Sequence, residues 1–292
     1  MSRGPGQLRI GTCSWKYPSW AGLVYSAPKG IDYLAEYARR YDTVEVDQWF
    51  WSLFGPDRVV LPREADVAAY RRAVPEHFRF TIKAPNSLTL THYHSKAKTE
   101  PLVPNPYWLS PDLARAFLAL LAPLYDVLGP VMFQFEYMNR QKMASSARFL
   151  EQLAAFSEGL PPGTTYGVEV RNPNYINAAY FEALQRLRLA PVLLQGYWMT
   201  PVADVYRHWR RLLIEQETIV VRLHGPDRER VESETGGQWD RIVAPRDDEL
   251  ATIADVVLDL LNEGVTVYLN VNNHYEGSAP LTIERLRRLL GE

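Results

Sequence analysis

The chain has 292 residues, of which 47% are hydrophobic and 23% are charged, and this composition excludes wholesale disorder. The formal net charge of −2 gives no indication of a broad nucleic-acid-binding face. The single cysteine, Cys13, excludes an internal disulfide and a zinc site made of several cysteines.

Eight short segments rich in β-branched and apolar residues recur along the chain, each followed by a helical pattern. The predicted strands are 8–15, 43–51, 78–84, 131–136, 165–171, 190–196, 218–224 and 265–273. Helices are predicted over 31–40, 111–128, 249–261 and 280–290. For the second of these, Ser110 is the expected N-cap, Pro111 the first helical residue and Pro123 the site of a kink.

Regular alternation of strands and helices indicates a parallel sheet. Eight such units in 292 residues fit one (β/α)8 TIM-like barrel domain over 1–292 better than a doubly wound sheet, because no dinucleotide fingerprint or phosphate-binding loop is present. The long connections 16–29, 52–62, 86–110 and 225–245 all follow strands. We therefore expect long loops, and a functional site, at the C-terminal strand ends.

The predicted strands are not uniformly apolar, as buried parallel strands usually are. Because side chains alternate between the two faces of a strand, one set of charged residues must point into the barrel. This set is Glu45, Asp47, Lys83, Glu136, Glu169, Arg171, Arg222 and His224. Burying so many charges is costly, which favours a binding or catalytic site. The alternative is a structural ion-pair network, in which Lys83, Arg171 and Arg222 neutralise Glu45, Glu136 and Glu169.

Within this set we predict acid/base chemistry. Glu136 or Glu169 would be the acid or base, His224 a second proton carrier, and the three cations ligands for negative charge. Lys83 could instead be a Schiff-base amine if desolvated, although neighbouring charges argue against this. The candidate catalytic residues are Glu45, Lys83, Glu136, Glu169, Arg171, Arg222 and His224.

Aromatic residues make up 12% of the chain and gather after the predicted strands, where they could stack sugars or bases. Amide side chains close to them could read hydroxyl groups. The candidate substrate-binding residues are Trp15, Tyr17, Trp20, Asp47, Trp49, Gln134, Asn270, Asn272 and Asn273.

No cofactor is predicted. A divalent metal remains an alternative, either at His92-Tyr93-His94 or deeper among Glu45, Glu136, Glu169 and His224. The cations already expected beside these acids argue against the second site.

The same segments resemble the domain of unknown function 72 family, also called YecE-like. The motifs that carry the resemblance span the chain from about Leu8 to Leu290, and they are 10–17 with Trp20, 43–47, 78–85, 129–135, 167–172, 221–225 and 268–273 with Ala279. The resemblance implies a TIM-like barrel and no established reaction. Asp47, Trp49, Trp51 and Glu136 depart from the usual family pattern, so we expect a more acidic and more aromatic mouth.

We therefore expect an enzyme, a hydrolase, lyase or isomerase, acting on a small or oligomeric substrate that is hydroxyl-rich or anionic, such as a sugar, sugar acid or nucleotide-like molecule. The alternatives are a metal-dependent phosphodiesterase or nucleic-acid-binding protein, and a binding module whose charged lumen is structural. No run of about 20 apolar residues and no secretory signal is present, so we expect a cytoplasmic protein without a membrane partner. The oligomeric state stays open.

Overall fold

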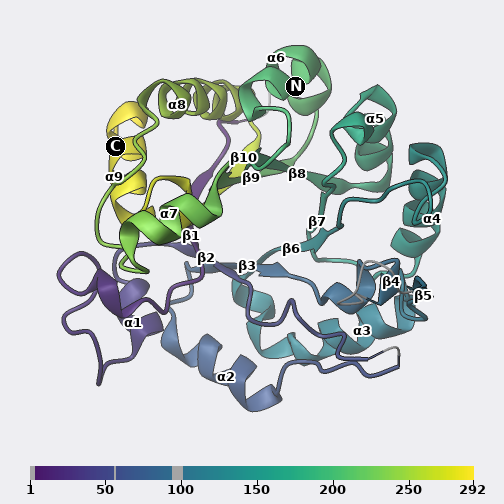
Figure 1. Ribbon diagram of the computed structural model, residues 1–292, viewed down its shortest axis with the longest axis horizontal. Helices are drawn as coiled ribbons and strands as arrows, with labels where there is room; N and C mark the ends of the chain where they lie inside the picture. Colours follow the sequence, from purple (N-terminus) through teal and green to yellow (C-terminus); the bar gives the residue numbers. More distant parts are fainter. Residues whose placement is uncertain (1–3, 56, 94–100) are drawn as a thin grey trace.

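The computed structural model describes residues 4–55, 57–93 and 101–292. Eight parallel strands close into a barrel in the order β1-β10-β9-β8-β7-β6-β3-β2, and helices surround it (Figure 1). The barrel strands are β1 (Leu8–Cys13), β2 (Thr43–Val46), β3 (Arg79–Lys83), β6 (Leu128–Gln134), β7 (Tyr166–Glu169), β8 (Leu189–Gly196), β9 (Thr218–Gly225) and β10 (Thr266–Val271). The predicted (β/α)8 fold is confirmed.

The α-helices follow the strands in chain order. They are α1 (Tyr33–Tyr37), α2 (Glu64–Ala73), α3 (Pro111–Leu120), α4 (Ser146–Glu158), α5 (Ala178–Leu187), α6 (Val202–Leu213), α7 (Arg228–Thr235), α8 (Asp247–Asn262) and α9 (Ala279–Leu290). The connection after β3 adds a short antiparallel pair, β4 (His92–Tyr93) with β5 (Val103–Pro104). In the part of the chain that the structure describes, no helix is long and apolar enough to cross a membrane.

Helix α3 begins as predicted but ends early. The Ser110 hydroxyl accepts a hydrogen bond from the Leu113 amide, and Pro111 occupies the first turn. The predicted continuation to residue 128 is wrong, because the helix ends at Leu120 and Ala122–Val127 forms a 3-10 segment. Pro123 has no N–H to donate to the preceding turn, so the chain stops the helix there instead of bending it.

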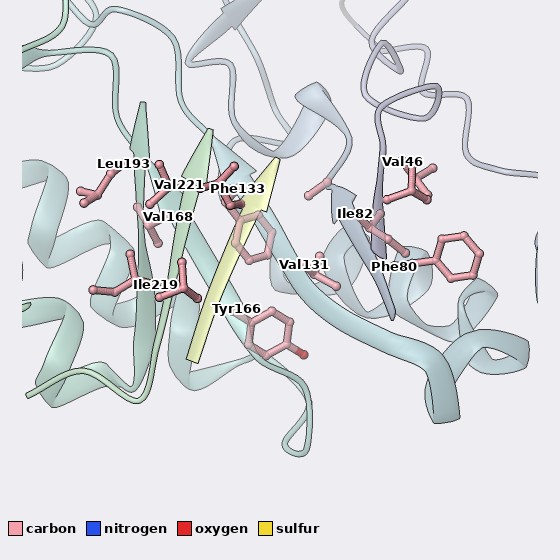
Figure 2. Close-up of a cluster of buried hydrophobic side chains, with 14 of the residues drawn as sticks. Val46, Phe80, Ile82, Val131, Phe133, Tyr166, Val168, Leu193, Ile219 and Val221 are labelled. Carbon is pink, nitrogen blue, oxygen red and sulfur yellow. The ribbon is translucent and has the colours of Figure 1, made fainter. Parts of the chain in front are cut away.

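The outer face of the barrel forms the main hydrophobic core. Val46, Ile82, Phe133 and Val168 are fully or almost fully buried, and Figure 2 shows them with neighbouring residues of the same cluster. They come from alternate positions of adjacent strands, since Val46 pairs with Ile82 and Phe133 with Val168 in register. Burial of this apolar face against the helices is what drives the strands together.

The barrel interior has two parts along its axis. A small apolar cluster of Met132, Val192, Val220 and Tyr268 lies towards the N-terminal strand ends. Two residues further along, the inward side chain is polar on three of these four strands (Gln134, Arg222 and Asn270), whereas β8 has Leu194. Polar side chains thus gather in the half of the lumen nearest the C-terminal strand ends, which is where sites of this fold form.

We predict that Gly11→Ala lowers the free energy of unfolding by about 1–3 kcal/mol or more, as overpacking does. A Cβ atom at Gly11 would lie 2.0 Å from the Thr43 carbonyl oxygen on the neighbouring strand, so β1 and β2 would have to separate. Urea denaturation measures the change. Gly55→Ala is the control, because a Cβ there meets only ordinary contacts. Equal stability of both variants would contradict this account of the β1–β2 contact.

Candidate functional site

A cavity of about 520 Å³ opens at the C-terminal ends of the barrel strands. Side chains from seven of the barrel strands or the residues that follow them line it, together with loop aromatics. The lining residues are Tyr17, Glu45, Asp47, Phe50, Trp51, Lys83, Asn86, Leu90, Gln134, Glu136, Tyr137, Arg171, Tyr197, Trp198, Arg222, His224, Arg228, Asn272 and His274. We call this cavity the barrel mouth.

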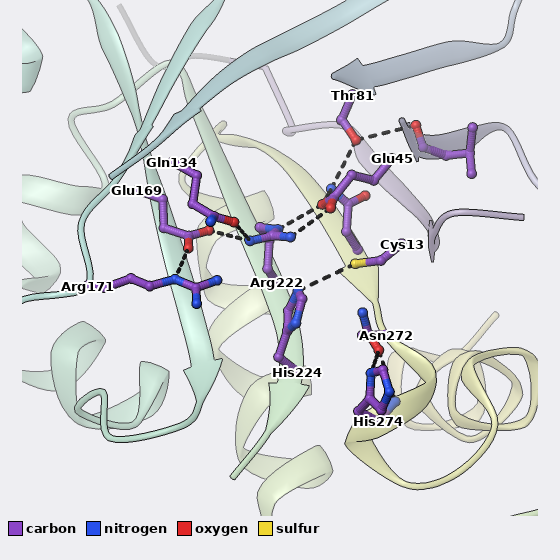
Figure 3. A network of polar contacts seen from close by, with 12 residues as sticks. Cys13, Glu45, Thr81, Gln134, Glu169, Arg171, Arg222, His224, Asn272 and His274 are labelled. Atoms are coloured by element: carbon purple, nitrogen blue, oxygen red, sulfur yellow. Dashed lines mark hydrogen bonds and ion pairs between the residues drawn. The ribbon is translucent and has the colours of Figure 1, made fainter. Parts of the chain in front are cut away.

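Arg222 forms the floor of the barrel mouth. Its guanidinium makes a bidentate ion pair with Glu45, with Nη2 to Oε1 at 2.7 Å and Nε to Oε2 at 2.8 Å, and its Nη1 lies 2.5 Å from Glu169 Oε2 (Figure 3). Nη1 also donates to Gln134 Oε1 at 3.2 Å. The Arg222 side chain is only 2% exposed. One arginine from β9 therefore pairs with two buried acids, from β2 and β7.

The two acids are further satisfied by neighbours. The Asn270 amide donates to Glu45 Oε2 at 3.2 Å and to Thr81 Oγ1 at 3.0 Å, and Arg171 Nε donates to Glu169 Oε1 at 3.1 Å. Burial alone would raise the pKa of Glu169, but the charges of Arg222 and Arg171 outweigh it and hold this pKa below its usual range. Glu169 is thus kept ionised, which does not suit the predicted role of an acid.

Glu136 lies at the rim and does not join this network. Its carboxylate pairs with Lys142 from the following loop and accepts a hydrogen bond from Thr91 Oγ1 at 3.3 Å. In the alternative of a structural ion-pair network, a lumen cation would neutralise Glu136, and this does not hold for this acid. The partner comes from six residues along the chain, because Glu136 stands two residues beyond the end of β6, where the chain leaves the barrel.

In the alternative of a structural ion-pair network, Lys83 would pair with a lumen acid, and this part of the alternative does not hold. Within the described chain Lys83 makes neither an ion pair nor a hydrogen bond, and its Nζ lies 3.8 Å from the centroid of the Phe50 ring. Burial, followed by the positive charge of Arg222, lowers the pKa of Lys83 to about 8. Arg222 has taken both deep carboxylates, so none is left for the lysine.

Asp47 is the neighbour of Lys83 by register. β2 and β3 pair in parallel up to Val46 and Ile82, and Asp47 and Lys83 are the next residues on the two strand paths. Burial, followed by the charge of Glu45, raises the pKa of Asp47. The barrel mouth thus sets beside one another an amine that loses its proton easily and a carboxyl that keeps its proton more readily than usual.

His224 sits between two weak partners. Its Nε2 lies 3.7 Å from Cys13 Sγ and its Nδ1 lies 3.4 Å from the Tyr197 hydroxyl. Burial, followed by the charges of Arg222 and Arg171, holds the pKa of His224 well below its usual range. The imidazole is therefore neutral near pH 7, so that it can accept but not donate a proton as an acid.

One cluster has the residue types of a metal site. Ligand atoms of Cys13, Glu45 and His224 lie within 4.8 Å of one another. Both Glu45 oxygens are already bound to Arg222, and burial and the Glu45 charge raise the pKa of the Cys13 thiol, so that it stays protonated. These residues do not fit a divalent cation. Of the alternative motif, the His92 ring contacts Thr91 Oγ1 at 2.9 Å, whereas His94 lies outside the described residues.

Three predicted substrate-binding tryptophans do not reach the barrel mouth. Trp15 and Trp49 both pack on Tyr70 of α2, with ring centroids 5.0 and 5.3 Å apart, and Trp20 is completely buried beside Tyr17. Tyr17 does line the cavity. The cavity is also lined by aromatic residues outside the candidate substrate-binding set, all of them in loops that follow a strand: Phe50, Trp51, Tyr137, Tyr197 and Trp198. Among them is Trp51, which the sequence analysis expects to make the mouth more aromatic.

Of the predicted amide side chains, some line the barrel mouth and others do not. Gln134 and Asn272 line the barrel mouth, whereas Asn270 lies beneath it in the Glu45 network. Asn273 is buried and its Oδ1 accepts a hydrogen bond from the Ala279 amide at 2.9 Å, so it holds the start of α9. Arg228 and His274, which are not among the candidate site residues, also line the cavity.

A sequence model of the family described as "Protein of unknown function DUF72" matches residues 9–292. The chain belongs to this family. The UPF0759 protein YecE of Escherichia coli strain K12 is 28% identical over 168 residues, which are 58% of this chain and 50% of the relative. The chain thus matches about half the length of the curated relatives.

Two solved DUF72 structures share the barrel. The protein from Enterococcus faecalis V583 superposes with a TM-score of 0.67 at 18% identity, covering 98% of this chain and 96% of the other. The protein from Thermotoga maritima MSB8 superposes with a TM-score of 0.66 at 21% identity, covering 98% and 100%. At these identities the likeness establishes the fold of this DUF72 protein.

In this DUF72 protein we predict that Arg222→Met lowers the free energy of unfolding by about 3–5 kcal/mol, because it leaves Glu45 buried without a cation among the described residues and leaves Glu169 with Arg171 alone. Urea denaturation at neutral pH measures the loss. Arg171→Met is the matched control: Glu169 keeps Arg222, so its loss should be clearly smaller. A change of less than about 1 kcal/mol in Arg222→Met would refute the structural role of the floor.

His224 should make stability sensitive to mild acid. Below pH of about 6.5 the unfolded chain takes up a proton at His224 and the folded chain does not, so the free energy of unfolding falls as the pH drops, by up to about 1.4 kcal/mol per pH unit. His224→Gln should flatten this dependence between pH 6.5 and about 5. The exposed His208→Gln serves as control and should keep the wild-type slope. The same slope in all three proteins would contradict a neutral buried imidazole.

Proposed function

We propose that this DUF72 protein is an enzyme that binds a small anionic, hydroxyl-bearing substrate in the barrel mouth and moves protons with Lys83 and Asp47. The observation that carries the proposal is that some lumen charges are paired with one another and others are not. Arg222 saturates the two deepest acids, while Lys83, Asp47 and part of Arg171 remain available at the cavity. Charged groups that a purely structural network would consume are left unused.

Arg171 is the group best suited to hold an anion. Its Nε is bound to Glu169, and its two terminal nitrogens have no acceptor among the described residues. The guanidinium lies over the Tyr197 ring, 5.0 Å from its centroid, which fixes its plane. A guanidinium held in this way can bind a carboxylate or phosphate through both free nitrogens.

The rim of the barrel mouth supports a ring-shaped or planar substrate. Trp51 and Trp198 are 69% and 57% exposed although they border the cavity, and they come from the loops after β2 and β8. Large exposed aromatic faces beside a polar cavity suit stacking against a sugar ring. Gln134 and Asn272 add amide groups that can bind hydroxyls.

Proton movement follows from the two shifted groups. Lys83 reaches its neutral form near pH 8, so it can accept a proton, and Asp47 with its raised pKa can supply one. Glu136 and the neutral imidazole of His224 border the same cavity. This assignment moves the acid/base role from Glu169 to the β2–β3 side of the barrel mouth.

We predict that Arg171→Met weakens binding of the anionic ligand at least about tenfold, because charge-assisted hydrogen bonds are lost while Glu169 keeps Arg222. The measurement is a screen of sugar acids, glycosides and phosphodiesters by tryptophan fluorescence, with Trp51 and Trp198 as reporters, followed by titration of each hit. Arg148→Met, a surface variant of a helical ion pair, is the control and should bind normally.

Four results would contradict the proposal. No binding in the whole screen, or unchanged affinity in Arg171→Met, removes the anion site. Strongly salt-dependent binding of single-stranded nucleic acid without any small ligand would favour a nucleic-acid-binding protein. Binding of a small ligand that no assay shows to be converted, with wild-type behaviour in Asp47→Asn, would favour a binding module.

A further inference from the structure

Lys83 is a lumen cation without a counter-ion. Buried or half-buried lysines normally pair with a carboxylate, because an isolated ammonium loses its hydration without compensation. Here the described residues offer Lys83 no ion pair and no hydrogen bond, and the Phe50 ring covers it at 3.8 Å. The residue nonetheless borders the open cavity, so its amine can be reached from outside.

The reason lies in the geometry of the floor. Glu45 gives both oxygens to Arg222, and Glu169 divides its oxygens between Arg222 and Arg171. The rim acid Glu136 is held by Lys142. Each of these three acids that border or underlie the cavity thus has another cation, and only Asp47 remains beside the lysine.

This setting favours the free amine. Burial and the positive charge of Arg222 lower the pKa of Lys83. The negative charges of Glu45, Glu169 and Asp47 raise this pKa, but by less. With a pKa of about 8 in place of 10.5, the neutral fraction at pH 7 is roughly 300-fold larger than that of an ordinary lysine. Only the neutral amine is a nucleophile.

From the unpaired position, the access from the cavity and the neighbouring Asp47, we infer that Lys83 forms a covalent imine with an aldehyde or ketone that carries a carboxylate or phosphate. This inference rests on the proposed function and names its substrate class. Arg171, whose free nitrogens face no other acceptor in the described chain, binds the anionic group.

The reaction balances without a redox partner. The Lys83 nitrogen lone pair attacks the carbonyl carbon, and the carbonyl π pair moves to oxygen, which takes up a proton to give a carbinolamine. The hydroxyl then leaves as water with a second proton while nitrogen and carbon form the double bond. Asp47 starts protonated, gives its proton to the carbonyl oxygen, takes one from the attacking nitrogen and delivers that proton to the departing hydroxyl, so that it ends ionised beside a protonated imine.

The test is reductive trapping on the full chain. The protein is incubated with sodium borohydride and one of three probes: pyruvate for the carboxylate class, dihydroxyacetone phosphate for the phosphate class, and hydroxyacetone as the uncharged comparison. Intact mass and peptide mapping then locate the adduct. We expect one adduct on the Lys83 peptide with pyruvate or dihydroxyacetone phosphate, at least about tenfold less with hydroxyacetone, and a yield that rises from pH 6 to about pH 8.

Two variants of Lys83 and one control make the result specific. Lys83→Arg keeps the positive charge and Lys83→Met keeps the apolar stem, and both should lose the adduct; a thermal melt verifies that at least one of them folds. Lys16→Met, which alters an exposed lysine, should keep it. An adduct that persists in Lys83→Arg, or that spreads over surface lysines, overturns the inference.

Failure of the imine and failure of the proposed function can be separated. The same probes and the sugar acids are titrated by tryptophan fluorescence without borohydride. Binding that depends on Arg171 but leaves no trapped adduct refutes the imine and leaves the acid/base proposal standing. Absence of both binding and trapping refutes both.

Discussion

The barrel depends on the contact of one guanidinium with two carboxylates. Arg222 on β9 reaches across the lumen to Glu45 on β2 and Glu169 on β7, and it also touches Gln134 on β6. Each partner would be strongly unfavourable in this place without the others, since removing a charge from water costs several kcal/mol. The contact thereby fixes the distances across the lumen between four strands that are not all neighbours. These distances also set the width of the cavity above.

The same contact determines what the barrel mouth can do. Arg222 binds the carboxylates of Glu45 and Glu169 at the floor. The charged groups above the floor, Lys83 and Arg171, therefore do not form full ion pairs with these acids. Among the described residues, Lys83 makes no ion pair and lies against the Phe50 ring and beside Asp47. Arg171 uses one nitrogen to bind Glu169, and its other two have no acceptor there. Stable ion pairs at the floor and unpaired charged groups above them can therefore lie close together. The reason is that Arg222 occupies the carboxylates with which Lys83 and Arg171 would otherwise pair.

Much of the architecture could be predicted from the sequence, because it follows from local pattern. The β-branched segments, the period-two alternation and the long loops after strands predict the barrel, its polar lumen half and its functional end. Ser110 and Pro111 likewise predict the start of α3. These features need only neighbours in the chain.

The pairing of charges and the direction of the tryptophans could not be predicted, because they depend on closure of the barrel and on local turns. Nothing in the sequence indicates that Arg222, and not Lys83, meets Glu45, which is 177 residues away. Ser14 adopts φ of 63°, which breaks the strand alternation, so Trp15 turns outward to Tyr70. A turn from Asp47 to Phe50 does the same for Trp49.

The order of residues along the chain determines when each member of the Arg222 ion-pair network is synthesised. During synthesis Glu45 and Glu169 leave the ribosome before Arg222, by 177 and 53 residues. Until β9 exists, packing β2 and β7 into a closed interior would bury two carboxylates without the cation that stabilises both, so premature closure is disfavoured by several kcal/mol. The long sequence separation also makes this contact entropically late in folding. Arg222 arrives with β9, before β10 takes the last place in the ring between β9 and β1, so the cation is already present when the barrel closes.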